Sequence, residues 1–283
     1  VALASSLCAA SFGTDTGGSV RIPAAWNNLI GLKTSIGRVS VNGVLPLATS
    51  YDTVGPLTKS VKDASILFSI IANEAYFKFN DISLSKIKIL VAKGMPWEGC
   101  DTAVSETVKQ TISNLSKAGI NIIEKEISEI EEMHKLLAEN NGGNTVAEAY
   151  LKWKELIKKH STSMDPDVLK RMIMGKNMNK GSIKAIYDTE EILSKKLHLS
   201  MDTYDAILMP TIPILPPTID NVRSSAKTYD KYNRLALKNT RIANSLRMCA
   251  ITLPCPGSLP IGIMLCKSLG KDEELLNLAE NIF

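Results

Sequence analysis

The chain has 283 residues, of which 45% are hydrophobic and 22% are charged, and its formal net charge is +4. These values are typical of a globular protein with a sizeable core, and such a small net charge gives no reason to expect nucleic acid or an anionic membrane as a partner. No apolar run is long enough to span a bilayer. We therefore expect a single domain over residues 1–283, located in the cytoplasm.

The cysteines and histidines favour neither a disulfide framework nor a metal site. The five cysteines are odd in number and form no Cys-x-x-Cys pair, and the three histidines lie far from them in sequence. Free or buried thiols are expected from this pattern, and no zinc-ligand spacing occurs. We expect no metal and no cofactor.

The first sixty residues predict short elements around one glycine-rich loop. We expect the end of a helix over residues 1–6, a buried strand over 7–14 and a helical turn over 22–28. An apolar run over 29–32 is typical of a short strand. Glycines and prolines punctuate residues 39–56, which predicts loops and short strands there.

The next part alternates strands with helices. A helix begins at Ser60, which can cap it and is followed by apolar residues at helical spacing. A strand over 87–92, a helix over 102–117 and a strand over 120–127 have the order of a βαβ unit. Residues 130–199 are mostly helical. Three methionines of this stretch are expected to fill the core rather than line a pocket: Met172, Met174 and Met178.

The last part predicts further strands and a closing helix. A buried strand is expected over 206–209, one or two helices over 229–249, and a strand pair over 250–254 and 261–266. The final helix is expected to be capped by Asp272. Together these elements predict an α/β fold with a mixed, largely central β-sheet flanked by helices.

The most informative stretch is residues 13–23, Gly-Thr-Asp-Thr-Gly-Gly-Ser-Val-Arg-Ile-Pro. Its adjacent glycines, Gly17 and Gly18, can adopt positive φ and leave space for a ligand, so that successive N–H groups form an anion-binding nest. Ser19 follows directly, and a hydroxyl beside such donors has what acyl transfer needs. A tight turn is the alternative. A phosphate-binding loop fits less well, because Ser19 stands where the lysine of that loop would follow the last glycine.

The residues do not identify a general base for this serine. There is no Gly-x-Ser-x-Gly elbow, since Arg21 takes the place of its last glycine. The histidines lie in the helical middle of the chain, far from the loop: His134, His160 and His198. A Ser-x-x-Lys spacing can be found at Ser83 with Lys86 and at Ser224 with Lys227, but chance allows this in a lysine-rich chain, and no Ser-Asp-Asn partner accompanies either pair.

Several segments resemble, in the same order, the amidase signature family of serine hydrolases, which cleave carboxamides. The likeness begins with residues 13–23 and covers both ends of the chain. The middle, from about 83 to 202, diverges from the family, and a helical part of it is expected over about 128–203. The other matching segments are 29–33, 37–40, 43–46, 52–56, 204–211 and 259–263. The resemblance implies the amidase signature fold and a small-molecule amide as substrate.

The resemblance also implies a Ser-Ser-Lys triad in which Ser19 is the nucleophile. The implied oxyanion hole consists of the backbone amides of Thr16, Gly17, Gly18 and Ser19. Asp15 could act as an acid or base, but we expect it to orient the loop by accepting backbone N–H bonds. Arg21 could bind a substrate carboxylate, but we expect it to pair with Asp15.

The bridging serine and the lysine of the family lie upstream of the nucleophile loop, in a segment that would precede Val1. None of the earlier serines, Ser5, Ser6 and Ser11, has the family's Gly-Ser-Ser-Gly-Gly context. Lys33 falls in a family segment with no base role. We therefore expect this chain to be the C-terminal portion of an amidase, with the N-terminal part missing, and to be inactive alone.

Two positions bear on the substrate. Ile22 stands where the glutamine-hydrolysing subunit of the tRNA-dependent amidotransferase usually has Gln, and Gly17 stands where allophanate hydrolases usually have Ala. Both favour a general amidase that acts on small or aryl carboxamides. The alternatives are a glutamine-hydrolysing amidotransferase subunit, which needs partner subunits, and a non-catalytic remnant. The sequence leaves the oligomeric state open, with a homodimer among the options.

Overall fold

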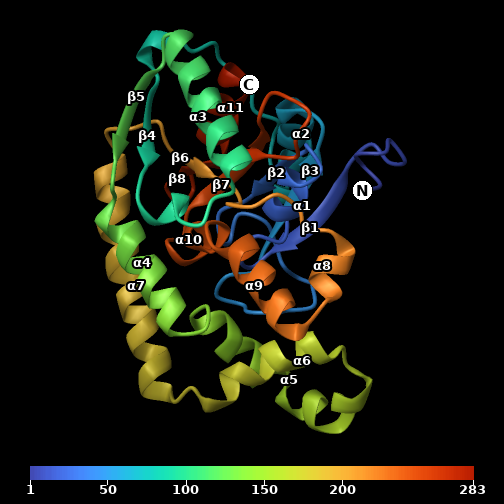
Figure 1. Ribbon diagram of the computed structural model, residues 1–283. Helices are drawn as coiled ribbons and strands as arrows, with labels where there is room; N and C mark the ends of the chain where they lie inside the picture. Colours follow the sequence, from blue (N-terminus) through green and yellow to red (C-terminus); the bar gives the residue numbers. More distant parts are fainter.

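The computed structural model describes residues 1–283 and contains one mixed β-sheet of eight strands with helices on both faces (Figure 1). This confirms the fold class expected from the sequence. The strands are β1 (Ser11–Asp15), β2 (Ile30–Lys33), β3 (Thr53–Thr58), β4 (Lys88–Ala92), β5 (Asn121–Lys125), β6 (Ala206–Pro210), β7 (Cys249–Pro254) and β8 (Gly262–Lys267). The helices are α1 (Arg21–Ala25), α2 (Val61–Ala72), α3 (Thr102–Lys117), α4 (Ser128–Glu139), α5 (Asn144–His160), α6 (Pro166–Ile173), α7 (Lys180–Met201), α8 (Ile219–Arg223), α9 (Ala226–Leu237), α10 (Thr240–Ser245) and α11 (Asp272–Ile282).

The strand order is β1-β3-β2-β7-β8-β6-β4-β5. Strand β4 runs parallel to β5 and to β6, and all other neighbours are antiparallel. The predicted βαβ unit is therefore confirmed, with α3 as the crossover between β4 and β5. The predicted strand pair near the C-terminus is confirmed as well, with Cys249 of β7 opposite Lys267 of β8.

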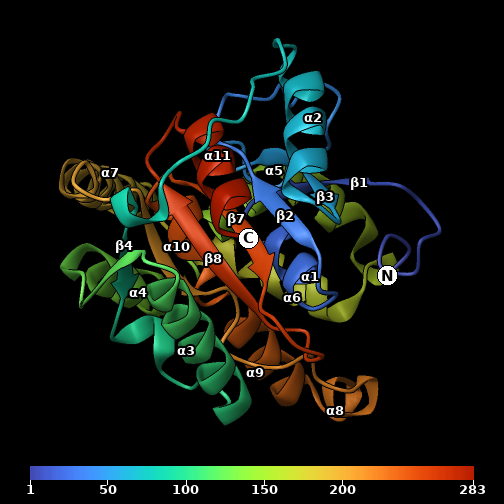
Figure 2. The same cartoon turned by 90° about the horizontal axis from the view of Figure 1, so that it is seen from above.

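The two faces of the sheet build separate cores, because successive side chains of a strand point to opposite faces. Ile89 and Val91 of β4 belong to a cluster of 26 buried residues shared with α2, α3 and α11. Leu90 and Ala92 belong to a cluster of 18 buried residues shared with α4, α7 and α10. Figure 2 shows α11 lying across β7 and β8. Because α10 belongs to the cluster of 18 buried residues and α11 to the cluster of 26, these two helices lie on opposite faces of the sheet.

The helical middle of the chain divides into two parts. Helices α4 and α7 pack on the sheet through the second core. Helices α5 and α6 pack on each other and lie beyond the sheet, at the bottom of Figure 1, near α8 and α9. None of the helices combines the length and the apolar character that crossing a bilayer requires.

Four local expectations were wrong. Residues 1–6 form turns rather than a helix, and β1 begins at Ser11 instead of residue 7, because residues 5–9 are exposed and have no strand to pair with. The strand is also largely exposed rather than buried, with only Asp15 buried. Asp272 does not cap α11, whose N-cap residue is Lys271. The Asp272 carboxylate is buried and accepts a hydrogen bond of 2.7 Å from the Ser35 backbone N–H, so it ties α11 to the chain after β2.

Candidate active site

Ser19 lies in the turn between β1 and α1. Strand β1 pairs with β3 only as far as Asp15, which is opposite Thr53, so the chain is released from the ladder at Thr16. The Ser19 side chain is exposed, its hydroxyl makes no hydrogen bond within the chain, and it lines a cavity of about 610 Å³. The hydroxyl that the sequence pattern singles out is therefore accessible to a ligand.

Four consecutive backbone N–H groups of this turn make no hydrogen bond to any acceptor in the chain. They belong to Thr16, Gly17, Gly18 and Ser19. Beyond them the N–H groups are occupied again, since Val20 donates to the Asp15 carboxylate at 3.2 Å and Ile22 donates to the Gly18 carbonyl at 2.8 Å. The four loop amides are thus available to an anion, and unpaired donors of this kind are rare in folded proteins.

The two glycines of the loop differ in what they require. Gly18 has φ of +134°, and a Cβ atom there would lie 2.2 Å from Thr240 Oγ1, so only glycine fits. Gly17 does not have positive φ, and a Cβ atom there would lie 3.4 Å from Arg241 Cγ, in ordinary contact. The expectation that both glycines adopt positive φ is correct for Gly18 and wrong for Gly17.

Side chains from distant segments fix the loop. The Thr240 hydroxyl of α10 donates to the Gly17 carbonyl at 2.7 Å. The Thr16 hydroxyl donates to Asp52 Oδ1 at 2.5 Å, and the second oxygen of this carboxylate accepts the N–H groups of Leu47 and Ala48. Asp52 therefore joins the loop to the segment before β3.

Asp15 and Arg21 form the ion pair expected from the sequence, at 2.8 Å, with both side chains fully buried. Burial by itself raises the pKa of Asp15, but the charge and hydrogen bonds of Arg21 outweigh it and hold the pKa of this carboxyl at about 2. Asp15 is therefore permanently ionised near neutral pH, which excludes it as a general acid. It accepts the Val20 N–H, in keeping with a role in orienting the loop.

The partners that complete this pair were not predicted from the sequence. Arg21 also donates to Asn244 Oδ1 at 2.6 Å and to the Thr240 carbonyl at 2.9 Å, and Asn244 Nδ2 donates to Asp15 Oδ1 at 3.0 Å. Thr240 and Asn244 are four residues apart and so lie on one face of α10. That spacing was visible in the sequence, but nothing in it connects this face to a loop more than 200 residues earlier.

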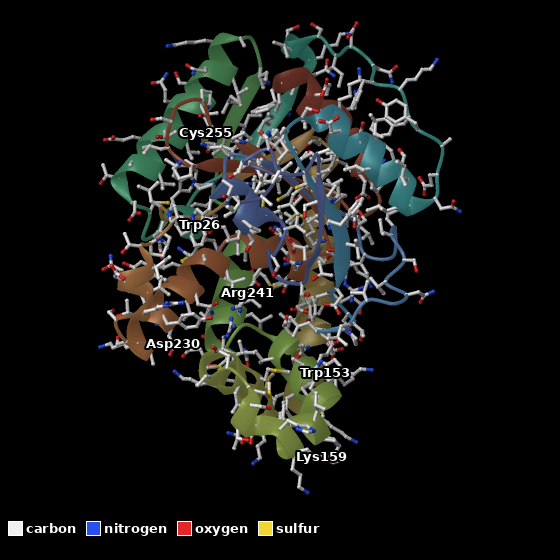
Figure 3. All side chains as sticks on the ribbon, turned by 90° about the vertical axis from the view of Figure 1, so that its right-hand side faces the viewer. Trp26, Trp153, Lys159, Asp230, Arg241 and Cys255 are labelled. Atoms are coloured by element: carbon white, nitrogen blue, oxygen red, sulfur yellow. The ribbon has the colours of Figure 1, made fainter.

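The cavity in front of Ser19 is mostly apolar and is closed by helices. Figure 3 shows its surroundings from the side, with Trp26 near α1, Trp153 on α5 and Arg241 between them. Most of its 21 lining residues come from the loop, α1, α5, α6, α8, α9 and α10. The segment before Ser50 contributes as well, and Trp153 holds it through a hydrogen bond of 2.9 Å to the Pro46 carbonyl.

Met172 is one of these lining residues, so its assignment to the core was wrong. The reason is that α6 packs on α5 rather than on the sheet, so that Met172 lines the cavity instead of a core beside the sheet. Met174 and Met178 are half-buried and do not line the cavity.

No base for Ser19 is present among the lining residues. None of them is His, Lys, Asp or Glu. His134 is buried in α4, and burial lowers its pKa to about 3. Lys33 is fully buried and burial lowers its pKa to about 8, but its ammonium group donates to the carbonyls of Thr34 and Met248 and does not line the cavity. No cluster of three or more His, Cys, Asp or Glu side chains that could hold a metal ion occurs in the chain.

Comparison with known proteins shows which family the chain matches. The Amidase family model matches residues 1–276. The chain is 27% identical to 2-amino-5-chloromuconic acid deaminase from Comamonas testosteroni, over 96% of this chain and 59% of that protein. It is 29% identical to a subunit of glutamyl-tRNA(Gln) amidotransferase from Saccharolobus solfataricus, over 99% of this chain and 65% of that protein.

Solved structures agree with this result. The allophanate hydrolase structure from Kluyveromyces lactis superposes with a TM-score of 0.87 at 27% identity, covering all of this chain and 47% of the other. The chain spans about three fifths of the length of the deaminase and of the amidotransferase subunit. A family match over almost the whole of its 283 residues shows that the chain belongs to the Amidase family.

Proposed function

We propose that this chain provides the nucleophile and the oxyanion hole of an amidase, with residues 1–283 forming one catalytic domain. The Ser19 Oγ attacks the carbonyl carbon of a carboxamide, and the four loop amides donate hydrogen bonds to the oxyanion that develops. The C–N bond then breaks and ammonia or an amine leaves with a proton. Water hydrolyses the resulting ester and regenerates the Ser19 hydroxyl.

The observation that carries the proposal is the coincidence of an exposed, unbonded hydroxyl with four consecutive unpaired amides, of which those of Thr16, Gly17 and Ser19 belong to residues that line one cavity. Thr16 and Gly18 are buried, and buried N–H donors without a partner are rare in folded proteins. Loss of a single oxyanion-hole donor typically lowers kcat by ~100–1000-fold, so such donors are a large part of the catalytic machinery.

The proton of Ser19 must go to a group outside the cavity lining described above. The amidase signature family uses a bridging serine and a lysine for this step, and no lysine lines the cavity here. We therefore expect the 283-residue chain alone to show negligible amide turnover. Rapid turnover by the purified chain would show that a base for Ser19 lies among residues 1–283. It would contradict the expectation that the chain is inactive alone.

Labelling with a fluorophosphonate probe tests the nucleophile in the full-length protein. The serine oxygen displaces fluoride from phosphorus, and mass spectrometry locates the added mass on the peptide that contains Ser19. We expect the Ser19→Ala variant to lose the label completely and the Ser11→Ala variant, altered on exposed β1, to keep it. Unchanged labelling of Ser19→Ala would overturn the proposal.

A further inference from the structure

The cavity contains two positive charges and no negative one. Its only charged lining residues are Arg171 of α6 and Arg241 of α10. Neither forms an ion pair with any carboxylate of the chain. Two like charges in a largely apolar cavity are unfavourable unless an anion joins them.

Arg241 lines the cavity, and its side chain has no hydrogen-bond partner in the chain. Its Cγ packs against Gly17, and its Nη1 lies 2.5 Å from where a Cβ atom on Gly142 would be. Gly142 has φ of +99° and no side chain, which leaves room for the guanidinium group. Burial, and to a lesser extent the charge of Arg171, lower the pKa of Arg241 to about 10, so it remains charged near neutral pH. Its donors are therefore charged and unused.

Arg171 is held in place only in part. Its Nη1 donates to Asn233 Oδ1 at 2.9 Å, and its guanidinium carbon lies 5.7 Å from the centre of the Tyr229 ring. Its Nε is buried and has no partner. Asn233 and Tyr229 also line the cavity, so neutral groups position this arginine while its charge stays uncompensated.

We propose that Arg241 and Arg171 bind a carboxylate carried by the amide substrate, so that the protein acts on amic acids, which combine a carboxamide with a carboxylate. This inference rests on the proposed function of Ser19. A planar guanidinium group binds a carboxylate through two parallel hydrogen bonds, and Arg241 presents such a group next to the oxyanion loop. Arg241 Cγ and Nε lie 3.4 Å and 3.7 Å from where a Cβ atom on Gly17 would be, so this side chain lies close to the oxyanion loop.

Binding measurements on the Ser19→Ala protein test the substrate class without turnover. The probes are succinamate, glutaramate and adipamate, each compared with the neutral diamide of the same length. Isothermal titration calorimetry gives the affinities, and the fluorescence of Trp26, which lines the cavity, reports the site of binding. We expect at least one amic acid to bind ~10–100-fold more tightly than its diamide, the range for hydrogen bonds to charged groups.

Three arginine variants test which side chains cause the preference for amic acids over diamides. Arg241→Gln and Arg171→Gln are each expected to reduce the preference for the carboxylate at least tenfold. Arg234→Gln removes the same charge from an exposed position of α9 that does not line the cavity, and it is expected to leave the preference unchanged. Thermal unfolding of each variant verifies folding, and Arg171→Gln keeps the test decisive if Arg241→Gln does not fold.

Equal binding of amic acids and diamides overturns the inference, and so does the absence of binding by the whole series or a preference that persists in both cavity variants. The proposed function fails separately. Labelling of Ser19 by a neutral fluorophosphonate needs no carboxylate site, so its loss would refute the nucleophile, whereas binding of amic acids would stand.

Discussion

Two arginines lie next to the same loop, and the chain treats them differently. Arg21, which follows the loop, is fully buried and bonds to Asp15, Asn244 and the Thr240 carbonyl. The side chain of Arg241, one residue after Thr240, bonds to nothing in the chain and faces the cavity. The two arginines therefore differ in their bonding partners, although both lie beside the loop.

The charge of Arg21 is compensated within the fold, whereas the charge of Arg241 is not. Burying a guanidinium group is costly unless a carboxylate or several acceptors compensate it. For Arg21 the compensation is internal, and the result is a rigid support for Ser19. In the cavity the compensation is left to a molecule from outside. The following changes test this division.

The largest effect is expected from Arg21→Gln. This variant leaves Asp15 ionised and buried without its partner, which typically costs about 3–5 kcal/mol of stability. Urea denaturation followed by circular dichroism measures the loss. Arg234→Gln, on the surface, serves as the control and is expected to change the free energy of unfolding by about 0.5 kcal/mol or less. A loss below about 1 kcal/mol for Arg21→Gln would contradict the structural role of this arginine.

A smaller effect separates the two loop glycines. Gly18→Ala forces a non-glycine residue into strained backbone and against Thr240, and the strain alone costs about 1–3 kcal/mol. Gly17→Ala meets only ordinary contacts, so it is expected to retain nearly the full stability. Differential scanning calorimetry of the two variants checks this order. Equal melting temperatures would show that the loop adapts to a side chain at position 18.

The third expectation concerns acid. The pKa of Asp15 is about 2 in the folded protein against an ordinary value of 3.8, so its contribution to stability is complete above about pH 4 and is lost as the pH falls through 2. The difference corresponds to about 2 kcal/mol. Unfolding free energies of wild type and Asp15→Asn at several pH values isolate this contribution. Parallel pH profiles for the two proteins would refute the lowered pKa.

The smallest effect is expected from Arg241→Gln. Because the side chain of this arginine has no partner in the chain, its removal breaks no bond and relieves the repulsion from Arg171. The free energy of unfolding is expected to stay within about 1 kcal/mol of wild type or to rise. Urea denaturation under the conditions used for Arg21→Gln checks it. A loss as large as that of Arg21→Gln would remove the distinction between the two arginines.

The sequence predicted the sheet and the Asp15–Arg21 pair better than the cavity. Periodicity and turn residues revealed β4, α3, β5 and the strand pair near the C-terminus, because these signals are local. The ion pair of Asp15 with Arg21 was foreseeable as well, since the two residues are six apart. Arg241 and Arg171 gave no signal, because a charge on a helix is ordinarily solvated. Only the packing of α5 and α6 over the loop reveals that these two face a cavity.

The hydrogen bond from Thr240 to the Gly17 carbonyl joins positions 223 residues apart. During synthesis on the ribosome, the loop emerges before α10, so the support from Thr240 does not exist until α10 has been made. A nascent polypeptide that lacks α10 therefore carries Ser19 without the contacts that Thr240 and Asn244 make to the loop.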